Sequence, residues 1–111
     1  MGAIRVAVFC NDTDKFNQCI DAFLNDPCGG ISNTLPNGQN GDMGRDQGHS
    51  GPMVGNLATA CEVAWAQGVD LYGVLDNRLF KCSEYWSKYN LGEDVPWIDH
   101  GTCYGYYTSI G

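Results

Sequence analysis

Gln67-Gly68-Val69-Asp70 decides the fold, because it separates two long segments that both repeat apolar residues at helical spacing. In the first segment Pro52 suits a first helical turn, and the apolar face ends at Gly68, a residue type that often follows a helix. In the second, Asp70 suits a helix cap, and the pattern ends at Asn90-Leu91-Gly92. The two faces comprise Val54, Leu57, Ala58, Cys61, Ala64 and Trp65, then Leu71, Val74, Leu75, Leu79 and Cys82 or Trp86. The sequence predicts two helices in an antiparallel hairpin.

A second pair of helices is expected at the start of the chain. Asn11-Asp12-Thr13-Asp14 is a cluster of capping residues, and apolar residues then recur at helical spacing up to Asn25-Asp26-Pro27. These are Phe16, Cys19, Ile20, Phe23 and Leu24. The apolar run 3–10 is too short for its period to decide between strand and helix, and the helix that follows it favours helix.

The remaining segments read as loops. Residues 27–43 are rich in Gly, Asn, Pro and Ser, which predicts a long ordered loop of the kind that often belongs to a binding surface. Residues 93–111 show no clear period, and we expect a loop without a closing element. The fold class is therefore all-α, with paired antiparallel helical hairpins and long Gly-rich loops in one domain over 1–111.

Composition excludes several classes of function. The net charge of −7 argues against a nucleic-acid partner, because binding phosphates requires many Lys and Arg residues. No apolar run is long enough to cross a membrane, and no signal peptide is recognisable at the start of this chain.

The six cysteines allow two interpretations. An even number in a short chain without zinc-site spacing favours disulfides, and hence a secreted protein in an oxidising compartment. Alternatively, four of them are buried small hydrophobes within helices, namely Cys10, Cys19, Cys61 and Cys82. The pairing does not follow from the sequence.

Two polar sets carry the candidate chemistry. Gly44-Arg45-Asp46-Gln47-Gly48-His49-Ser50 brings a cation, an amide, an imidazole and a hydroxyl to the head of a helix, and Asp76-Asn77-Arg78 with Tyr85 lies on the next one. Such groups suit removal of the C5 proton of a uronic acid, where the carboxylate must be neutralised and a base and an acid supplied. The alternatives are structural: helix capping by Asp46 or Ser50, a surface ion network around Arg78, and a core position for Tyr85.

The ordered series of motifs resembles the alginate lyase family of polysaccharide lyases over most of the chain. The motifs are Val8-Phe9-Cys10-Asn11-Asp12, Pro36-Asn37-Gly38-Gln39, Gly44–Ser50, Leu57-Ala58, Cys61-Glu62-Val63-Ala64-Trp65, Gln67–Tyr72, Leu75-Asp76-Asn77-Arg78-Leu79, Glu84-Tyr85 and Lys88–Gly92. The resemblance implies a partial (α/α) toroid and metal-independent β-elimination on an acidic polysaccharide such as alginate or glucuronan, with no cofactor. Members of the family are several times longer than this chain, so the resemblance implies a piece of a lyase, with self-association as one way to cover its exposed helical face.

The resemblance also assigns residues. Gln47 resembles the amide that neutralises the uronate carboxylate, His49 the histidine that assists it or acts as base, and Arg78 and Tyr85 the arginine and catalytic tyrosine. Gly48 separates Gln47 from His49, whereas the family often has an adjacent Asn-His pair, so the individual roles of these two residues stay open. The resemblance assigns Tyr85 more firmly, as the proton donor and a candidate for the base as well. Further substrate contacts are expected from Arg45, Asn77, Lys81 and Tyr89.

Two other hypotheses compete with the lyase. One is a non-catalytic, disulfide-stapled module that binds carbohydrate or protein. The other is a metal site built from His49, His100 and Asp46, which the sequence supports poorly because the two histidines lack ligand spacing.

Overall fold

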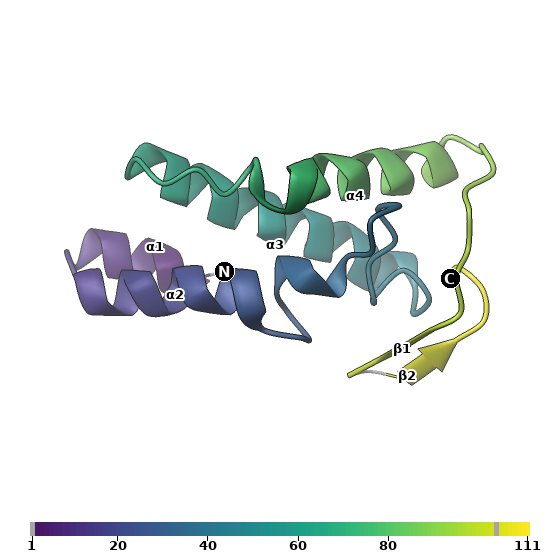
Figure 1. Ribbon diagram of the computed structural model, residues 1–111, viewed down its shortest axis with the longest axis horizontal. Helices are drawn as coiled ribbons and strands as arrows, with labels where there is room; N and C mark the ends of the chain where they lie inside the picture. Colours follow the sequence, from purple (N-terminus) through teal and green to yellow (C-terminus); the bar gives the residue numbers. More distant parts are fainter. Residues whose placement is uncertain (1, 104) are drawn as a thin grey trace.

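The computed structural model describes residues 2–103 and 105–111, and over these it places four α-helices in two hairpins followed by a small β-hairpin (Figure 1). The first hairpin pairs α1 (Gly2–Phe9) with α2 (Thr13–Asn25), and the second pairs α3 (Gln47–Ala66) with α4 (Val74–Asn90). Because α3 and α4 lie along the long axis, the molecule is elongated, with extents of 43 × 24 × 23 Å. The predicted all-α class and the paired hairpins are confirmed, and the toroid stays a prediction.

The first hairpin forms as its sequence pattern indicates. The Asp12 side chain caps α2 by accepting a hydrogen bond from the Lys15 N–H at 2.9 Å. Ile4 and Ala7 of α1 and Phe23 of α2 are buried. Phe23 has no exposed surface and joins the main core, so this hairpin is packed against the second one.

The main core lies where α2, α3 and α4 meet. Its buried residues are Phe23, Ile31, Leu57, Ala60, Cys61, Ala64, Leu71 and Leu79. The α3 members recur every three or four residues, which places them on one face of the helix. Burying side chains of this kind stabilises the fold by about 1.5–3 kcal/mol for each large one.

The helix α3 begins earlier than Pro52 suggests. Asp46 is its N-cap and accepts a hydrogen bond from the His49 N–H at 3.0 Å, so the head of α3 holds the polar stretch itself, with Pro52 one turn inside. At the other end Gly68 adopts a φ of +82°, which confirms its role in ending the helix. Neither α3 nor any other helix in the described part is long and apolar enough to cross a membrane.

The helix α4 begins later than predicted, and Asp70 does not cap it. Asp70 instead accepts a hydrogen bond from the Gly73 N–H at 3.2 Å and stabilises the connecting turn. The helix begins at Val74, and residues 75–77 adopt left-handed backbone angles with φ between 51° and 58°. Since these three residues have a Cβ, each left-handed position costs about 1–2 kcal/mol. Regular right-handed geometry therefore starts only at Arg78.

The loop 27–43 is ordered, as predicted, and is folded onto the helices. It contains a 3-10 turn (Ile31–Asn33) and a bridge between Thr34 and Asn40. Gln39 is 1% exposed, because its side-chain amide donates to the Ile98 carbonyl and accepts from the Ile98 N–H. Gly38 lies so close to α4 that a Cβ there would meet the Lys81 carbonyl oxygen at 2.2 Å.

The tail contains a closing element, which corrects the expectation of a loop. Strands β1 (His100–Thr102) and β2 (Gly105–Tyr107) pair antiparallel, with His100 opposite Tyr107; Tyr104 lies outside the described residues. Tyr107 packs against Gly44, where an added Cβ would lie 2.3 Å from the Tyr107 Cβ and 2.4 Å from its ring. This hairpin therefore lies beside the polar stretch that precedes α3 (Figure 1).

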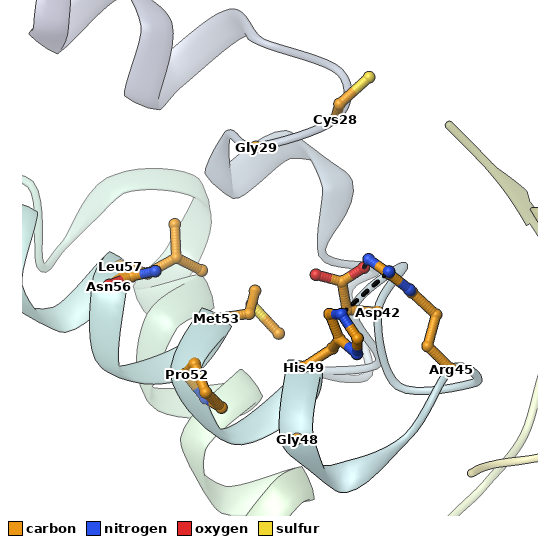
Figure 2. A pocket seen from close by; sticks show the side chains of 10 residues that line it. All are labelled: Cys28, Gly29, Asp42, Arg45, Gly48, His49, Pro52, Met53, Asn56 and Leu57. Carbon is orange, nitrogen blue, oxygen red and sulfur yellow. Dashed lines mark hydrogen bonds and ion pairs between the residues drawn. The ribbon is translucent and has the colours of Figure 1, made fainter. Parts of the chain in front are cut away.

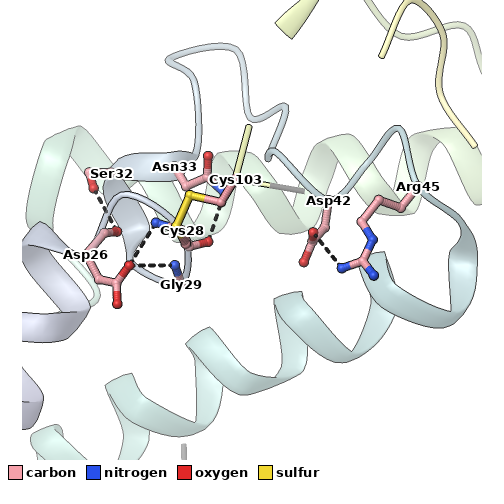
Figure 3. The surroundings of a disulfide bond; sticks show 8 residues. All are labelled: Asp26, Cys28, Gly29, Ser32, Asn33, Asp42, Arg45 and Cys103. Carbon is pink, nitrogen blue, oxygen red and sulfur yellow. Dashed lines mark hydrogen bonds and ion pairs between the residues drawn. A yellow bond between two sulfur atoms is a disulfide. The ribbon is translucent and has the colours of Figure 1, made fainter. Parts of the chain in front are cut away.

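A disulfide joins the β-hairpin to the loop 27–43. Cys28, in the loop after α2, is bonded to Cys103 at the tip of the β-hairpin, 75 residues later (Figure 3). Both interpretations of the cysteines are thus partly confirmed: Cys61 and Cys82 are free and buried within helices, whereas Cys10 is free and exposed and Cys19 is half-buried. Burial raises the pKa of the Cys82 thiol to about 12.

Candidate functional site

A pocket of about 380 Å³ opens at the head of α3, where the predicted polar stretch lies (Figure 2). Its volume is at the lower end of the range for small-ligand sites. One wall is the first three turns of α3, another is the loop that precedes it, and a third is the backbone beside the disulfide. The lining residues are Cys28, Gly29, Asp42, Arg45, Gly48, His49, Pro52, Met53, Asn56 and Leu57.

His49 is held between a carboxylate and a guanidinium. Its Nδ1 lies 2.8 Å and 2.9 Å from the two carboxylate oxygens of Asp46, and its Nε2 lies 3.0 Å from Nη2 of Arg45. Because an arginine can only donate, Nε2 must accept, and the proton of the neutral ring then lies on Nδ1, pointing at Asp46. Asp46 thus fixes the tautomer and the orientation of the ring, as a carboxylate does for a general-base histidine. The lone pair on Nε2 then points towards Arg45.

Asp46 serves both the helix and the ring. The same carboxylate that caps α3 through the His49 N–H also accepts from the His49 ring, so the predicted capping role is confirmed and a second contact is added. The hydrogen bond from the His49 ring, with smaller contributions from charge and backbone N–H groups, lowers the pKa of Asp46. Asp46 is therefore ionised at neutral pH.

Arg45 lies between two acceptors. Besides His49, it forms an ion pair with Asp42 at 3.5 Å between Nη1 and Oδ1 (Figures 2 and 3). Ser50 is fully buried and donates its hydroxyl to the Asp46 carbonyl at 3.0 Å. Arg45 is thus in an ion pair and Asp46 caps the helix, whereas Ser50 bonds back to a carbonyl of the preceding turn and does not cap α3.

The other predicted catalytic residues do not line this pocket. Gln47 donates from Nε2 to the Gly111 carbonyl at 2.9 Å, so its amide faces the tail. Arg78 donates to the Thr34 carbonyl at 2.6 Å and holds the ordered loop against α4. Tyr85 is 3% exposed, and its hydroxyl donates to the Pro96 carbonyl at 2.7 Å. The expectation of one cleft shared by all four residues is not met.

Tyr85 belongs to a second core cluster. The cluster consists of Met43, Val54, Cys82 and Tyr85, with Met53, Trp86, Val95, Trp97 and Ile110 packed against it. Desolvation on burial raises the pKa of Tyr85 to about 12, so the phenol stays protonated at neutral pH. The core interpretation of Tyr85 describes its surroundings.

The predicted substrate contacts are also dispersed. Lys81 forms an ion pair with Asp76 at 2.9 Å and lines a different hollow, between α4 and residues 94–96. Asn77 lines a hollow at the far end of α3, and Tyr89 is half-buried on α4. Only Arg45 of this group lies with His49.

The metal alternative finds no ligand set. Within residues 2–103 and 105–111, no group of three or more His, Cys, Asp or Glu side chains could hold an ion. His100 lies on β1, in a different element from His49 and Asp46.

Two pocket residues were missed by sequence reasoning. Asp42 precedes Arg45 by three residues, a spacing that brings the two side chains together in a turn. Asn56 follows His49 by seven residues, which is two helical turns and hence the same face of α3. Extending the helix back to Asp46 would have revealed the second of these.

No protein-family model, curated protein or solved structure matches this chain.

Proposed function

We propose that this chain contributes to a polysaccharide lyase that cleaves a uronic-acid polymer of the alginate or glucuronan type by β-elimination, with its reacting groups at the head of α3. The observation that carries the proposal is the Asp46–His49–Arg45 contact within the pocket. The pairing supplies a carboxylate-oriented imidazole next to a cation, which are two of the groups that the reaction requires.

The proposed steps use these groups alone. Arg45 binds the uronate carboxylate and stabilises the charge that develops when the C5 proton leaves. On binding the uronate the Arg45 guanidinium leaves His49 Nε2, whose freed lone pair accepts that proton, and Asp46 stabilises the resulting imidazolium. The C5 electron pair forms the C4–C5 double bond, the C4–O bond breaks, and the imidazolium returns its proton to the departing glycosidic oxygen. Proton and electrons therefore balance without a cofactor.

The resemblance to alginate lyases and the single disulfide add support from other directions. The disulfide favours an oxidising compartment, where a secreted polysaccharide-degrading enzyme would act. In this proposal Tyr85, Gln47 and Arg78 are structural, since each donates to a backbone carbonyl.

The test follows the unsaturated product by its ultraviolet absorbance, with alginate and glucuronan as substrates and an active lyase as positive control. Replacing His49 with Ala should lower turnover by about 10²–10⁴-fold. The matched control is His100→Ala, which removes the other histidine and should leave turnover unchanged. Absence of product from every uronate polymer, or equal turnover in His49→Ala and the parent, would contradict the proposed lyase activity at His49.

A second candidate is a module that binds an acidic sugar without cleaving it. It is favoured by the burial of Tyr85, which leaves the pocket without a separate proton donor. Calorimetric titration with alginate oligomers distinguishes the two: binding that Arg45→Met abolishes, together with no product, supports the module.

A further inference from the structure

A second pocket, which the proposed lyase chemistry does not use, lies at the opposite end of α3. It has a volume of about 430 Å³, and we call it the aromatic pocket. Its lining residues are Glu62, Trp65, Asp70, Tyr72, Gly73, Asn77 and Phe80. Trp65 follows His49 by 16 residues, so at about 1.5 Å per residue the two pockets are about 24 Å apart along the helix.

Three aromatic rings form one continuous surface in this pocket. Trp65 meets Tyr72 edge to face, with ring centroids 6.2 Å apart, and Tyr72 stacks with Phe80 at 6.0 Å. Trp65 and Phe80 are each 58% exposed, which is unusual for such large apolar side chains. More than half of each of these two side chains is thus accessible to a ligand.

The middle ring is held in position. The Tyr72 hydroxyl donates to Glu62 at 2.5 Å, and this hydrogen bond raises the pKa of Tyr72 to about 12, so the phenol stays protonated. Asp70 is fixed in the connecting turn by the Gly73 N–H. The aromatic surface and its acidic rim are therefore ordered without a ligand, which lowers the entropy cost of binding one.

The charge of the lining selects the kind of ligand. The charged residues in the lining are Glu62 and Asp70, which are both exposed, and the lining holds no Lys, Arg or His. The nearest basic residues along α4 are engaged elsewhere: Arg78 with the Thr34 carbonyl and Lys81 with Asp76. An aromatic face attracts cations through its quadrupole, and carboxylates add to this attraction. A uronate would be repelled here.

We propose that the aromatic pocket binds an organic cation of the alkylated ammonium type, with its apolar body on Trp65 and Phe80 and its charge near Glu62 and Asp70. A quaternary ammonium fits best, because it combines positive charge with an apolar surface and weak hydration. The site is independent of the proposed lyase activity, and either can fail without the other.

The test titrates the protein with choline at constant ionic strength and follows the Trp65 indole N–H by NMR. The neutral isostere of choline, in which carbon replaces the charged nitrogen, serves as the matched control ligand. We expect choline to bind and the isostere to bind about two- to fivefold more weakly, the ratio that a cation–π contribution at an exposed site implies. Equal binding of the two ligands, or no binding of choline, would overturn the proposal.

Variants locate the site. Trp65→Leu keeps an apolar side chain but removes the ring, and Glu62→Gln keeps an acceptor for Tyr72 but removes the charge; each should weaken choline binding about fivefold or more, followed by calorimetry. Phe9→Leu is the control, because Phe9 is a 90% exposed aromatic residue on another helix, and it should bind choline as the parent does.

The remaining outcomes identify other occupants. Binding of a trimethyllysine peptide as well as choline points to a protein tail as the source of the cation, and choline alone points to a free small molecule; both support the proposal. If choline does not bind, the proposal is overturned. Saturable binding of a neutral sugar that Trp65→Leu abolishes would then identify the pocket as a sugar site, and dimerisation in sedimentation that the same variant abolishes would identify it as a self-association surface.

Discussion

The head of α3 and the middle of α4 carry similar polar side chains and use them in opposite ways. At α3, Arg45, Asp46 and His49 bond to one another at the rim of a pocket. At α4, Arg78 and Tyr85 each donate to the backbone carbonyl of a distant loop. Each region places an arginine a few residues before a polar ring, so what distinguishes a candidate site from a structural contact is the partner of each polar atom.

The largest expected effect is on the free energy of unfolding, which should fall more when Tyr85 is replaced than when His49 is replaced. Tyr85→Ala removes a buried ring and should lower the free energy of unfolding by about 3–5 kcal/mol. Tyr85→Phe removes only the hydrogen bond to Pro96 and should cost about 1 kcal/mol. Urea denaturation measures both. A loss in Tyr85→Ala no larger than that in the pocket variant His49→Ala would break the comparison.

The next effect concerns the link between the pocket rim and the tail. Reducing the Cys28–Cys103 bond, or replacing both cysteines with Ser, should lower the free energy of unfolding by about 2–4 kcal/mol, because the bond closes a loop of 75 residues. Hydrogen exchange should show lost protection in the loop 27–43 and the β-hairpin, and retained protection in α4. Uniform loss over all elements would contradict this division.

A smaller effect compares two cations on α4. Arg78→Met should cost about 1.5–3 kcal/mol, since it removes a charge-assisted hydrogen bond to the Thr34 carbonyl. Lys81→Met is the matched control; it breaks an exposed ion pair with Asp76 and should cost less than about 1 kcal/mol. Equal costs in urea denaturation would show that the Arg78 contact is no stronger than a surface pair.

The smallest effect is a pH dependence at the head of α3. The His49 hydrogen bond lowers the pKa of Asp46 in the folded state, so the folded carboxylate binds its proton less readily than the unfolded one. Its contribution to stability is present above the unfolded pKa, near 4 for an ordinary aspartate, and is lost as pH falls through the lower folded pKa. Urea denaturation between about pH 2 and pH 6 should show a shallower acid loss in His49→Ala than in the parent.

A matched carboxylate controls that experiment. The pKa of Asp26 is also lowered, but by the backbone N–H groups of Cys28 and Gly29. Asp26→Asn should therefore make the acid loss shallower to the same extent in the parent and in His49→Ala. If His49→Ala leaves the acid limb unchanged, the ring does not lower the Asp46 pKa.

The helices could be predicted because their apolar faces repeat within a single element. Phe23 and Leu57 follow local periodicity, and Asp12 and Asp46 cap the residues directly after them. The β-hairpin could not, because each strand has three residues with glycine among them and no alternation of apolar and polar positions.

The candidate site follows the same division. Arg45, Asp46 and His49 lie within five residues, so their contact is a local property of one turn and a cap. The bonds that occupy Gln47 and Arg78 span 64 and 44 residues, and nothing in the local sequence reveals them. The contacts among the contiguous residues could therefore be expected from the sequence, whereas the distant partners of Gln47 and Arg78 could not.

The left-handed residues 75–77 also decide which part of α4 determines the rotation of the helix about its own axis. Three residues that wind in the opposite sense interrupt the helical phase, which is why Leu75 is 46% exposed although its spacing places it on the apolar face. Leu79, Cys82 and Tyr85, the buried residues of α4, all lie beyond the interruption, whereas Val74 before it is only partly buried against the main core. The rotation of α4 about its axis is thus determined from its C-terminal part, and we expect the connector to tolerate a change in length that the segment after Arg78 would not.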